Sequence, residues 1–320
     1  MSASPRILTL TLNPAVDLST RTAKVEPAHK MRCDAARVHP GGGGINVARV
    51  IARLGGSVNA LYPAGGPTGE RLRALLHDEH VPNEALTIAG ETRESFSVVE
   101  EASGREYRFV LPGPALSPAE WQDCLDRTAA AARGCAFVVA SGSLPPGVPQ
   151  DAYGQLARRL APMDVRLVLD TSGAALAGGL EARVHLFKPS LRELQELTGA
   201  ALAGTRERIA ACRAVIDRGQ AKVVALSLGA GGALLVAAGE AWQAPALHVA
   251  VASTIGAGDS FLGALVLGMA RGEPLERAFR SAMAASAAAL LNAGTALCSP
   301  GDLDRLLPQV QVARVDATAI

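Results

Sequence analysis

Hydrophobic residues along most of this chain follow a repeating pattern: a short apolar segment, a turn, and then an amphipathic helix. The apolar segments predict strands. We expect strands at residues 6–12, 136–140, 166–169, 185–187 and 223–228. We expect helices at residues 118–133, 153–160, 206–218 and 275–291. Strands that alternate with helices predict an α/β fold with a mostly parallel sheet and helices on both faces.

Two stretches interrupt this alternation. Residues 18–38 and 93–110 are polar and mixed, with no helical stripe, and therefore predict short strands. In the second stretch, residues 95–99 and 105–110 flank Ala102-Ser103-Gly104, which is a typical hairpin turn. We expect these stretches to form a small sheet that acts as a lid over a site, a dimer surface, or both. Residues 1–320 would then form a single α/β domain with this lid.

Residues 253–270 predict a loop that enters a helix. Gly256 and Gly258 allow backbone conformations and close approaches that a Cβ would block, so several amides can converge where the helix begins. These amides attract an anion, and Asp259 places a carboxylate beside them. This pairing suggests phosphoryl transfer to a hydroxyl, although Asp259 could simply cap the helix. The absence of any Gly-Lys pair excludes a P-loop, and Phe261 stands where a dinucleotide fingerprint needs its third glycine.

A second glycine-rich loop, Pro40-Gly41-Gly42-Gly43-Gly44-Ile45-Asn46, also leads into an amphipathic helix, which Gly55 ends. Four consecutive glycines lose much chain entropy on folding, which argues that the backbone there comes close to something. A flexible linker is the alternative, but it would not be followed so closely by a capped helix. Asn46 can both donate and accept hydrogen bonds, as the binding of a sugar hydroxyl requires.

Asp17 lies just beyond the end of the first predicted strand, which Asn13-Pro14 stops. In open α/β sheets, ligands bind outside the carboxyl ends of the strands, although a carboxylate there can equally be a solvated loop acid. The two strand-rich stretches carry the basic residues Lys30, Arg32, Arg93 and Arg108. Spacing alone does not bring these charges together, because charged residues on a small sheet are commonly solvated edges.

Composition narrows the class of protein. With 31 basic and 30 acidic residues among 320, the net charge is +1, which favours neither nucleic acid nor a membrane surface as a partner. We expect no signal peptide and no membrane span. The five cysteines are scattered without CxxC spacing, which argues against disulfides and metal sites and fits the reducing cytoplasm. The aromatic content of 3% leaves little material for stacking on nucleic-acid bases.

Three landmarks, in this order, make the chain resemble the ribokinase-like PfkB carbohydrate kinases over nearly its whole length. They are residues 9–17 (TLTLNPAVD), the glycine loop and helix at 41–56, and residues 253–260 (STIGAGDS). Within the family the chain looks closest to the minor, PfkB-type 6-phosphofructokinases, on the pattern of residues 41–46, 64–66, 107–110 and 141–147. The 1-phosphofructokinases and tagatose-6-phosphate kinases share much of this pattern, and many have lysine where Gly42 or Gly43 stands here.

The resemblance implies ATP-dependent phosphorylation of the 1-hydroxyl of fructose 6-phosphate to give fructose 1,6-bisphosphate. Asp259 would be the general base for that hydroxyl, and the amides of Gly256, Ala257 and Gly258 would stabilise the transferred phosphoryl group. The residues implied for the sugar ring are Asp17, Gly42, Gly43 and Asn46. Those implied for the phosphate already on the sugar are Lys30, Arg93, Arg108 and Ser143.

For ATP, the resemblance points to Lys188, Ser227, Gly229, Thr254 and Asn292. Magnesium would bridge the phosphates largely through water, with Glu193 as the acidic position, and potassium would bind near Ser253 and Ile255. The Asn-x-x-Glu that is usual in the family appears here as Ser190-Leu191-Arg192-Glu193, which also forms a capping box. We therefore expect an active enzyme with a raised magnesium requirement.

The resemblance also implies that the lid closes on substrate and excludes water, and that lids of two subunits pair in a homodimer. Two alternatives stay open for the function. The acceptor could be fructose 1-phosphate or tagatose 6-phosphate, because the orientation of a single hydroxyl depends on the placement of Asp17 and Asn46. The chain could instead be a sugar-phosphate or nucleotide sensor that kept the fold and lost catalysis, although the retained Asp259 and Gly258 argue against this.

Overall fold

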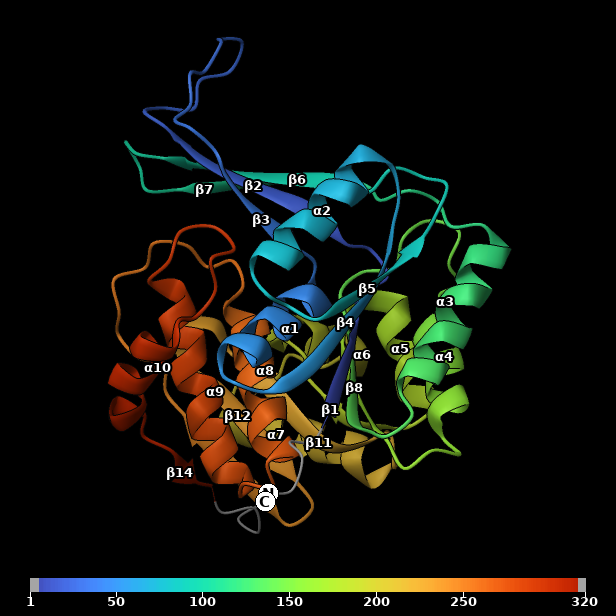
Figure 1. Cartoon of the computed structure of the whole chain (residues 1–320). Helices are drawn as coiled ribbons and strands as arrows, with labels where there is room; N and C mark the ends of the chain where they lie inside the picture. Colours follow the sequence, from blue (N-terminus) through green and yellow to red (C-terminus); the bar gives the residue numbers. More distant parts are fainter. Residues whose placement is uncertain (1–5, 316–320) are drawn as a thin grey trace.

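The structure, a computed structural model, describes residues 6–315 and is built on a ten-stranded sheet (Figure 1). The strands lie in the order β14 (Ala313–Arg314), β13 (Glu240–Ala244), β12 (Ala233–Ala237), β11 (Ala221–Ser227), β10 (Val184–Phe187), β9 (Arg166–Asp170), β8 (Cys135–Ser141), β1 (Arg6–Leu10), β4 (Ser57–Ala64) and β5 (Asn83–Thr87). Neighbouring strands from β11 to β5 pair in parallel. The predicted mostly parallel sheet is therefore confirmed.

The antiparallel edge formed by β12, β13 and β14 was not predicted from the sequence. A short connection with one 3-10 turn, η1 (Gly229–Gly231), joins β11 to β12, and it is too short for the crossover that a parallel neighbour needs. β12 therefore turns back along β11, and β13 turns back along β12. All five residues of β12 are buried, so its sequence lacks the alternation that marks a half-buried strand.

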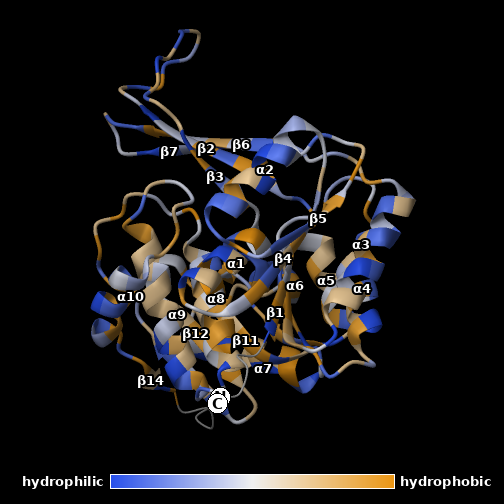
Figure 2. Cartoon of the chain, in the orientation of Figure 1, coloured by the Kyte–Doolittle hydropathy of each residue, from blue (hydrophilic) through white to orange (hydrophobic). Residues whose placement is uncertain are grey.

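Helices cover both faces of the sheet, as predicted, because alternate residues of each strand point to opposite sides. Ile7 of β1 belongs to one hydrophobic core and Leu8 to the other. The first core is covered by α1 (Gly43–Arg53), α2 (Gly66–Asp78), α8 (Ala257–Ala270), α9 (Leu275–Leu290) and α10 (Pro300–Leu306), followed by η2 (Leu307–Gln309). The second is covered by α3 (Pro118–Ala131), α4 (Ala152–Leu160), α5 (Gly173–Glu181), α6 (Leu191–Thr198) and α7 (Thr205–Asp217). Figure 2 shows hydrophobic residues gathered along the central strands that these helices cover.

A separate small sheet lies above one edge of this core in Figure 1. Its strands lie in the order β3 (Arg37–Gly41), β2 (Ala15–Thr22), β6 (Arg93–Glu100) and β7 (Glu106–Val110). The two strand-rich stretches of the sequence thus meet through the parallel pair β2 and β6, and β6 and β7 form the expected hairpin. Most of residues 23–36 form an extended loop between β2 and β3 rather than further strands.

The two faces of the small sheet differ in chemistry. On one face, cross-strand pairing aligns Asp17 with Ser95 and Ser97 with Arg108. On the other face, pairing aligns what we call the apolar row, one residue from each strand: Val38, Leu18, Phe96 and Phe109. The rings of Phe96 and Phe109 are stacked with centroids 4.9 Å apart, and they are 40% and 48% exposed. Exposed aromatic pairs of this kind often mark a contact surface.

The polar ends of several parallel strands lie at the edge that faces the small sheet. There β8 leads into Gly142, β9 ends at Asp170, and β10 leads into Lys188. This is the edge of an open α/β sheet where ligands bind. No helix within residues 6–315 is long and apolar enough to cross a membrane.

Candidate active site

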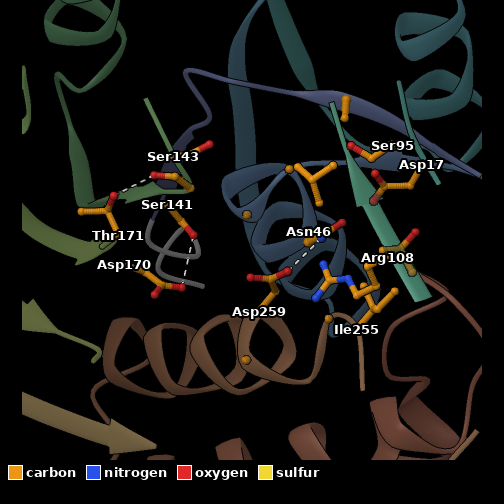
Figure 3. A pocket seen from close by; sticks show the side chains of 18 of the residues that line it. Asp17, Asn46, Ser95, Arg108, Ser141, Ser143, Asp170, Thr171, Ile255 and Asp259 are labelled. Atoms are coloured by element: carbon orange, nitrogen blue, oxygen red, sulfur yellow. Dashed lines mark hydrogen bonds between the residues drawn. The ribbon is translucent and has the colours of Figure 1, made fainter. Parts of the chain in front are cut away.

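A cavity of about 430 Å³ lies between the carboxyl ends of the parallel strands and the small sheet (Figure 3). Its volume is within the roughly 300–1,000 Å³ of typical small-molecule sites. Many residues singled out in the sequence line it: Asp17, Gly42, Gly43, Asn46, Arg93, Arg108, Ser143, Glu193, Thr254, Ile255, Gly256, Gly258 and Asp259. The fold thus brings Asp17, residues of both glycine-rich loops and residues of the strand-rich stretch at 93–110 to one place.

The four-glycine run is packed against the wall of this cavity, which explains its composition. A Cβ at Gly41 would lie 2.3 Å from the carboxyl carbon of Asp17, far inside normal contact distance. Gly42 has φ +112°, and a Cβ there would lie 2.7 Å from the Thr11 methyl group. The run therefore lets the first turn of α1 approach β1 and Asp17 more closely than other residues would allow. A flexible linker is excluded as its role.

The second glycine loop begins α8. Gly256 is the N-cap with φ +77°, a left-handed conformation that favours glycine. Because Gly256 has no side chain, the N-cap cannot accept a hydrogen bond from the amides of the first turn. These amides can therefore bind an anion. Asp259 lies in the same turn, and its carboxylate accepts a hydrogen bond of 2.8 Å from the side-chain amide of Asn46. Among residues 6–315, no backbone amide of α8 donates to this carboxylate, so capping is not its role.

Burial raises the pKa of several carboxyls of the cavity, among them Asp259 and Asp17. Burial raises the pKa of Asp259 to about 6, and the nearby charge of Asp170 acts in the same direction, while the Asn46 hydrogen bond opposes it. Burial also raises the pKa of Asp17 to about 6, against the opposing charges of Arg93, Arg49 and Arg108. A carboxylate with such a pKa is ionised at neutral pH and is still basic enough to take up a proton, as a general base must.

Lys188 lies behind the anion site rather than on the cavity wall. Its ammonium pairs with the buried carboxylate of Asp170 at 3.0 Å. Burial lowers the pKa of Lys188, but the charge of Asp170 outweighs this effect and the pKa is raised overall. A Cβ on Gly258 would lie 3.6 Å from the Lys188 ammonium, so this charge stands beside the first turn of α8. Amides and an ammonium together fit the phosphates of a nucleotide.

The two arginines that the small sheet contributes to the cavity wall differ in their hydrogen bonds. The Arg93 guanidinium donates to the carbonyl oxygens of Asn13 and Leu111, at 2.9 Å each. Arg108 makes no hydrogen bond or ion pair within the described part of the chain. In Figure 3, Arg108 and Asp17 lie on one side of Asp259, and Asp170 and Ser141 lie on the other. The cavity therefore combines an unpaired guanidinium, the buried carboxylate of Asp259, and the anion site in the first turn of α8.

Some residues singled out in the sequence lie outside the cavity wall: Lys30, Ser227, Gly229, Ser253, Ala257 and Asn292. Lys30 is exposed on the loop at residues 23–36. The Asn292 amide donates to the carbonyl oxygens of Ala288 and Leu297, which ties the end of α9 to the next loop. The Ser253 hydroxyl donates to the carboxylate of Glu106 on β7 at 3.0 Å.

Other residues of the wall were not assigned from the sequence: Ser95, Ser141, Asp170, Thr171, Ser172 and Thr295. Ser141 and Asp170 close predicted strands, so the rule that ligands bind at strand ends was the available signal. The hydroxyl of Ser141 donates to Asp170 at 3.3 Å. Thr295 had no comparable signal, because its place beside Asp17 depends on tertiary packing.

The predicted capping box at the start of α6 is present. The Glu193 carboxylate accepts from the backbone amide of Ser190 at 2.7 Å, and the Ser190 hydroxyl accepts from the amide of Glu193 at 3.3 Å. Within residues 6–315 no group of three or more His, Cys, Asp or Glu side chains is arranged to hold a metal ion. A magnesium ion bound through phosphates and water needs only one or two carboxylates, and Glu193 and Asp170 both line the cavity.

Comparison with known proteins gives a consistent picture. The model of the pfkB family carbohydrate kinases matches residues 10–302. The chain is 48% identical to ATP-dependent 6-phosphofructokinase isozyme 2 of Mycobacterium tuberculosis, over 94% of this chain and 88% of that protein. It is 43% identical to the isozyme 2 enzyme of Escherichia coli, over 94% of this chain and 97% of that one. The crystal structure of E. coli phosphofructokinase-2 in complex with fructose-6-phosphate superimposes with a TM-score of 0.90, at 40% identity, covering 95% of this chain and 99% of that one.

Proposed function

We propose that this chain, which belongs to the pfkB family of carbohydrate kinases, is an ATP-dependent 6-phosphofructokinase with Asp259 as its general base. It transfers a phosphoryl group from ATP to the 1-hydroxyl of fructose 6-phosphate. The observation that carries the proposed role of Asp259 is that its carboxylate lies in the first turn of α8, in the same cavity as the amides of that turn and the Arg108 guanidinium.

The residues of the cavity divide the work of this reaction. The phosphate of the sugar binds Arg108 of the small sheet through a charge-assisted hydrogen bond, and Ser143, in the loop after β8, supplies a hydroxyl. The phosphates of ATP lie against the amides of Gly256 to Gly258 and the Lys188 ammonium. Asp259 then takes the proton of the accepting hydroxyl as that oxygen attacks, and the amides stabilise charge on the transferred group. Asp17 and Asn46 orient the sugar hydroxyls.

An acceptor panel tests the substrate. The purified protein is assayed for ADP release with ATP, magnesium and potassium, using fructose 6-phosphate, tagatose 6-phosphate, fructose 1-phosphate, fructose and ribose at equal concentrations. We expect the highest kcat/KM with fructose 6-phosphate. A preference for another sugar phosphate would move the protein to the 1-phosphofructokinase or tagatose-6-phosphate kinase activity. Binding of sugar phosphate without ADP release would support the sensor function.

The role of Asp259 is tested by Asp259→Asn, which keeps the side-chain shape and an oxygen to accept from Asn46. We expect turnover to fall by roughly a hundredfold or more, within the range of a lost general base and a lost oriented contact. The affinity for ATP should stay near that of the wild type. If the variant kept near wild-type turnover, Asp259 would not be the base.

The proposal also covers the metal ions, the lid, the nucleotide and the cell compartment. Magnesium is held through Glu193 and water, with the Ser190 substitution raising the requirement for the ion, and potassium binds near Ser253 and Ile255. The small sheet closes over bound sugar phosphate as a lid of a single kinase domain, and Lys30 contacts the sugar phosphate in that closed state. Thr254, Ser227, Gly229 and Asn292 border the nucleotide. The protein works in the cytoplasm.

The apolar row of the small sheet supports a homodimer in which the lids of two subunits pack together. Stacked rings that are 40% and 48% exposed gain burial in such a contact. Phe96→Asp should shift the mass measured by light scattering toward that of a monomer. Val251→Asp is the matched control, because Val251 is 59% exposed and lies outside the small sheet. Equal masses for both variants and the wild type would contradict a dimer through this face.

A further inference from the structure

Arg49 of α1 is a charged side chain with no exposure to solvent, and the catalytic assignment leaves it without a role. Its guanidinium makes a two-bond pair with the carboxylate of Glu79, at 2.8 and 2.6 Å. It also donates to the carbonyl oxygens of Pro40 and Thr295, at 3.0 and 2.9 Å. The remaining contact is a hydrogen bond of 3.2 Å to the side-chain oxygen of Asn46. A buried charge needs hydrogen-bond partners such as Glu79 and the two carbonyls. The contact with Asn46 additionally connects Arg49 to the active site.

These contacts fix which way the Asn46 amide points. Arg49 has only donors, so the atom of Asn46 that faces it must be the amide oxygen. The Asp259 carboxylate is an acceptor when ionised, so the atom of Asn46 that faces it must be the amide nitrogen, at 2.8 Å. Asn46 and Arg49 are three residues apart on α1 and therefore share a face of the helix. A rotated Asn46 amide would oppose like groups on both sides.

A second contact of Arg49 leads toward Asp17, another carboxylate of the cavity. The carbonyl of Thr295 accepts from Arg49, and the Thr295 side chain is close enough to Asp17 to lower the pKa of that carboxyl. One guanidinium therefore holds a direct neighbour of Asp259 and a direct neighbour of Asp17. Glu79 holds the guanidinium in turn, from the far end of α2.

We propose that Arg49 is a positioning residue for the reaction, which orients the Asn46 amide so that this amide holds Asp259 ionised and aimed at the accepting hydroxyl. This inference rests on the proposed function of Asp259 as the base. It assigns no contact between Arg49 and substrate.

The chain provides a matched control on the same helix. Arg53 lies four residues after Arg49, pairs with the same Glu79 carboxylate at 2.9 Å, and donates to the carbonyl of Ala296. Like Arg49, Arg53 pairs with Glu79 and donates to a carbonyl of the loop at residues 295–296, but it makes no contact with Asn46. If the same substitution changes activity differently at the two positions, the difference reports the contact with Asn46.

The experiment compares Arg49→Lys with Arg53→Lys. Lysine keeps the charge, but its single ammonium cannot reproduce the planar fork that reaches Glu79, two carbonyls and Asn46 together. We expect kcat to fall about tenfold or more for Arg49→Lys, as for a lost hydrogen bond in a charged network, and less than about twofold for Arg53→Lys. The KM for ATP should change little in both.

The pH profile gives a readout that a purely structural role would not move. The charged groups that face Asp259 are Asp170 on β9, Lys188 after β10 and Asp17 on β2. The Asn46 hydrogen bond lowers the pKa of Asp259, so its loss raises that pKa. The acidic limb of kcat should therefore shift to higher pH in Arg49→Lys and stay in place in Arg53→Lys.

A double-mutant cycle keeps the inference testable if both lysine variants lose stability. If Arg49 acts through Asn46, Arg49→Lys should change kcat less than about twofold in an Asn46→Ala background. An undiminished tenfold loss in that background would overturn the inference, as would equal kcat and equal pH limbs for the two lysine variants. Asp259→Asn separates the two hypotheses. If it stays active, the base assignment fails; if it is inactive while Arg49→Lys behaves like Arg53→Lys, the inference about Arg49 alone fails.

Discussion

Replacing Asp259 by asparagine should stabilise the fold while it removes activity. Burial raises the pKa of this carboxyl from 3.8 to about 6, so the folded state binds its proton more tightly than the unfolded state does. At a pH above 6 the group is ionised in both states, and that ionisation costs the folded state about 3 kcal/mol. Asparagine carries no charge and can still accept from Asn46. The gain should therefore approach, without exceeding, that figure.

The sign of the pH dependence follows from the same shift. The wild type loses the stability of its protonated carboxyl as the pH rises from about 4 to about 6, and the variant does not. The difference in melting temperature should therefore grow across this window and stay constant above it. With an unfolding entropy of about 2.1 cal/mol/K per residue, we expect the variant to melt about 2–5 °C higher at pH 8.

The assay is thermal unfolding of both proteins by circular dichroism at several pH values between 4.5 and 8. Asp302→Asn is a control of opposite sign. Hydrogen bonds from Arg305 and Ser299 lower the pKa of Asp302, so its loss should reduce stability above pH 4. An Asp259→Asn variant that melted at or below the wild-type temperature at pH 8 would refute the burial argument. So would a difference that grew toward acid pH.

Three other variants test separate parts of the site. Arg108→Ala should raise the KM for fructose 6-phosphate roughly tenfold to a hundredfold, as expected for the loss of a charge-assisted hydrogen bond. The KM for ATP should change little, and equal changes in both KM values would count against a phosphate contact. Gly41→Ala should weaken sugar binding severely, because its Cβ would lie 2.3 Å from the Asp17 carboxyl carbon, whereas Gly204→Ala, whose Cβ meets nothing within 4 Å, should bind normally. Ser190→Asn should lower the magnesium concentration for half-maximal activity while preserving the N-cap, and an unchanged magnesium titration would exclude a role for this position.

The parallel part of the fold could be predicted because each strand and helix has its own local pattern. The turn between β6 and β7 was predictable for the same reason, since Ala102-Ser103-Gly104 marks it. The antiparallel edge was harder, because β12 is buried at every position and its direction depends on the length of one connection. Pairing of β2 with β6 involves segments more than seventy residues apart, which local patterns cannot join.

The residues of the candidate site also differ in whether a local sequence pattern identifies them. Residues of the two glycine loops could be identified because glycine, amide and carboxylate chemistry is concentrated there in short motifs. Arg49 could not, because in the sequence it is one of two basic residues on an amphipathic helix, and such residues usually face water. Only the folded chain places Glu79, Pro40 and Thr295 around it.

The small sheet has a consequence for how this protein can change. Alternate residues of β2, β6 and β7 serve different tasks: Asp17, Ser95 and Arg108 face the cavity, and Phe96 and Phe109 of the apolar row are exposed on the other face. A single inserted or deleted residue in β6 would exchange the two sets over the rest of the strand. Substrate recognition and the proposed subunit contact would then fail together. Point substitutions can tune either property alone, but the length of these strands is a constraint that both properties share.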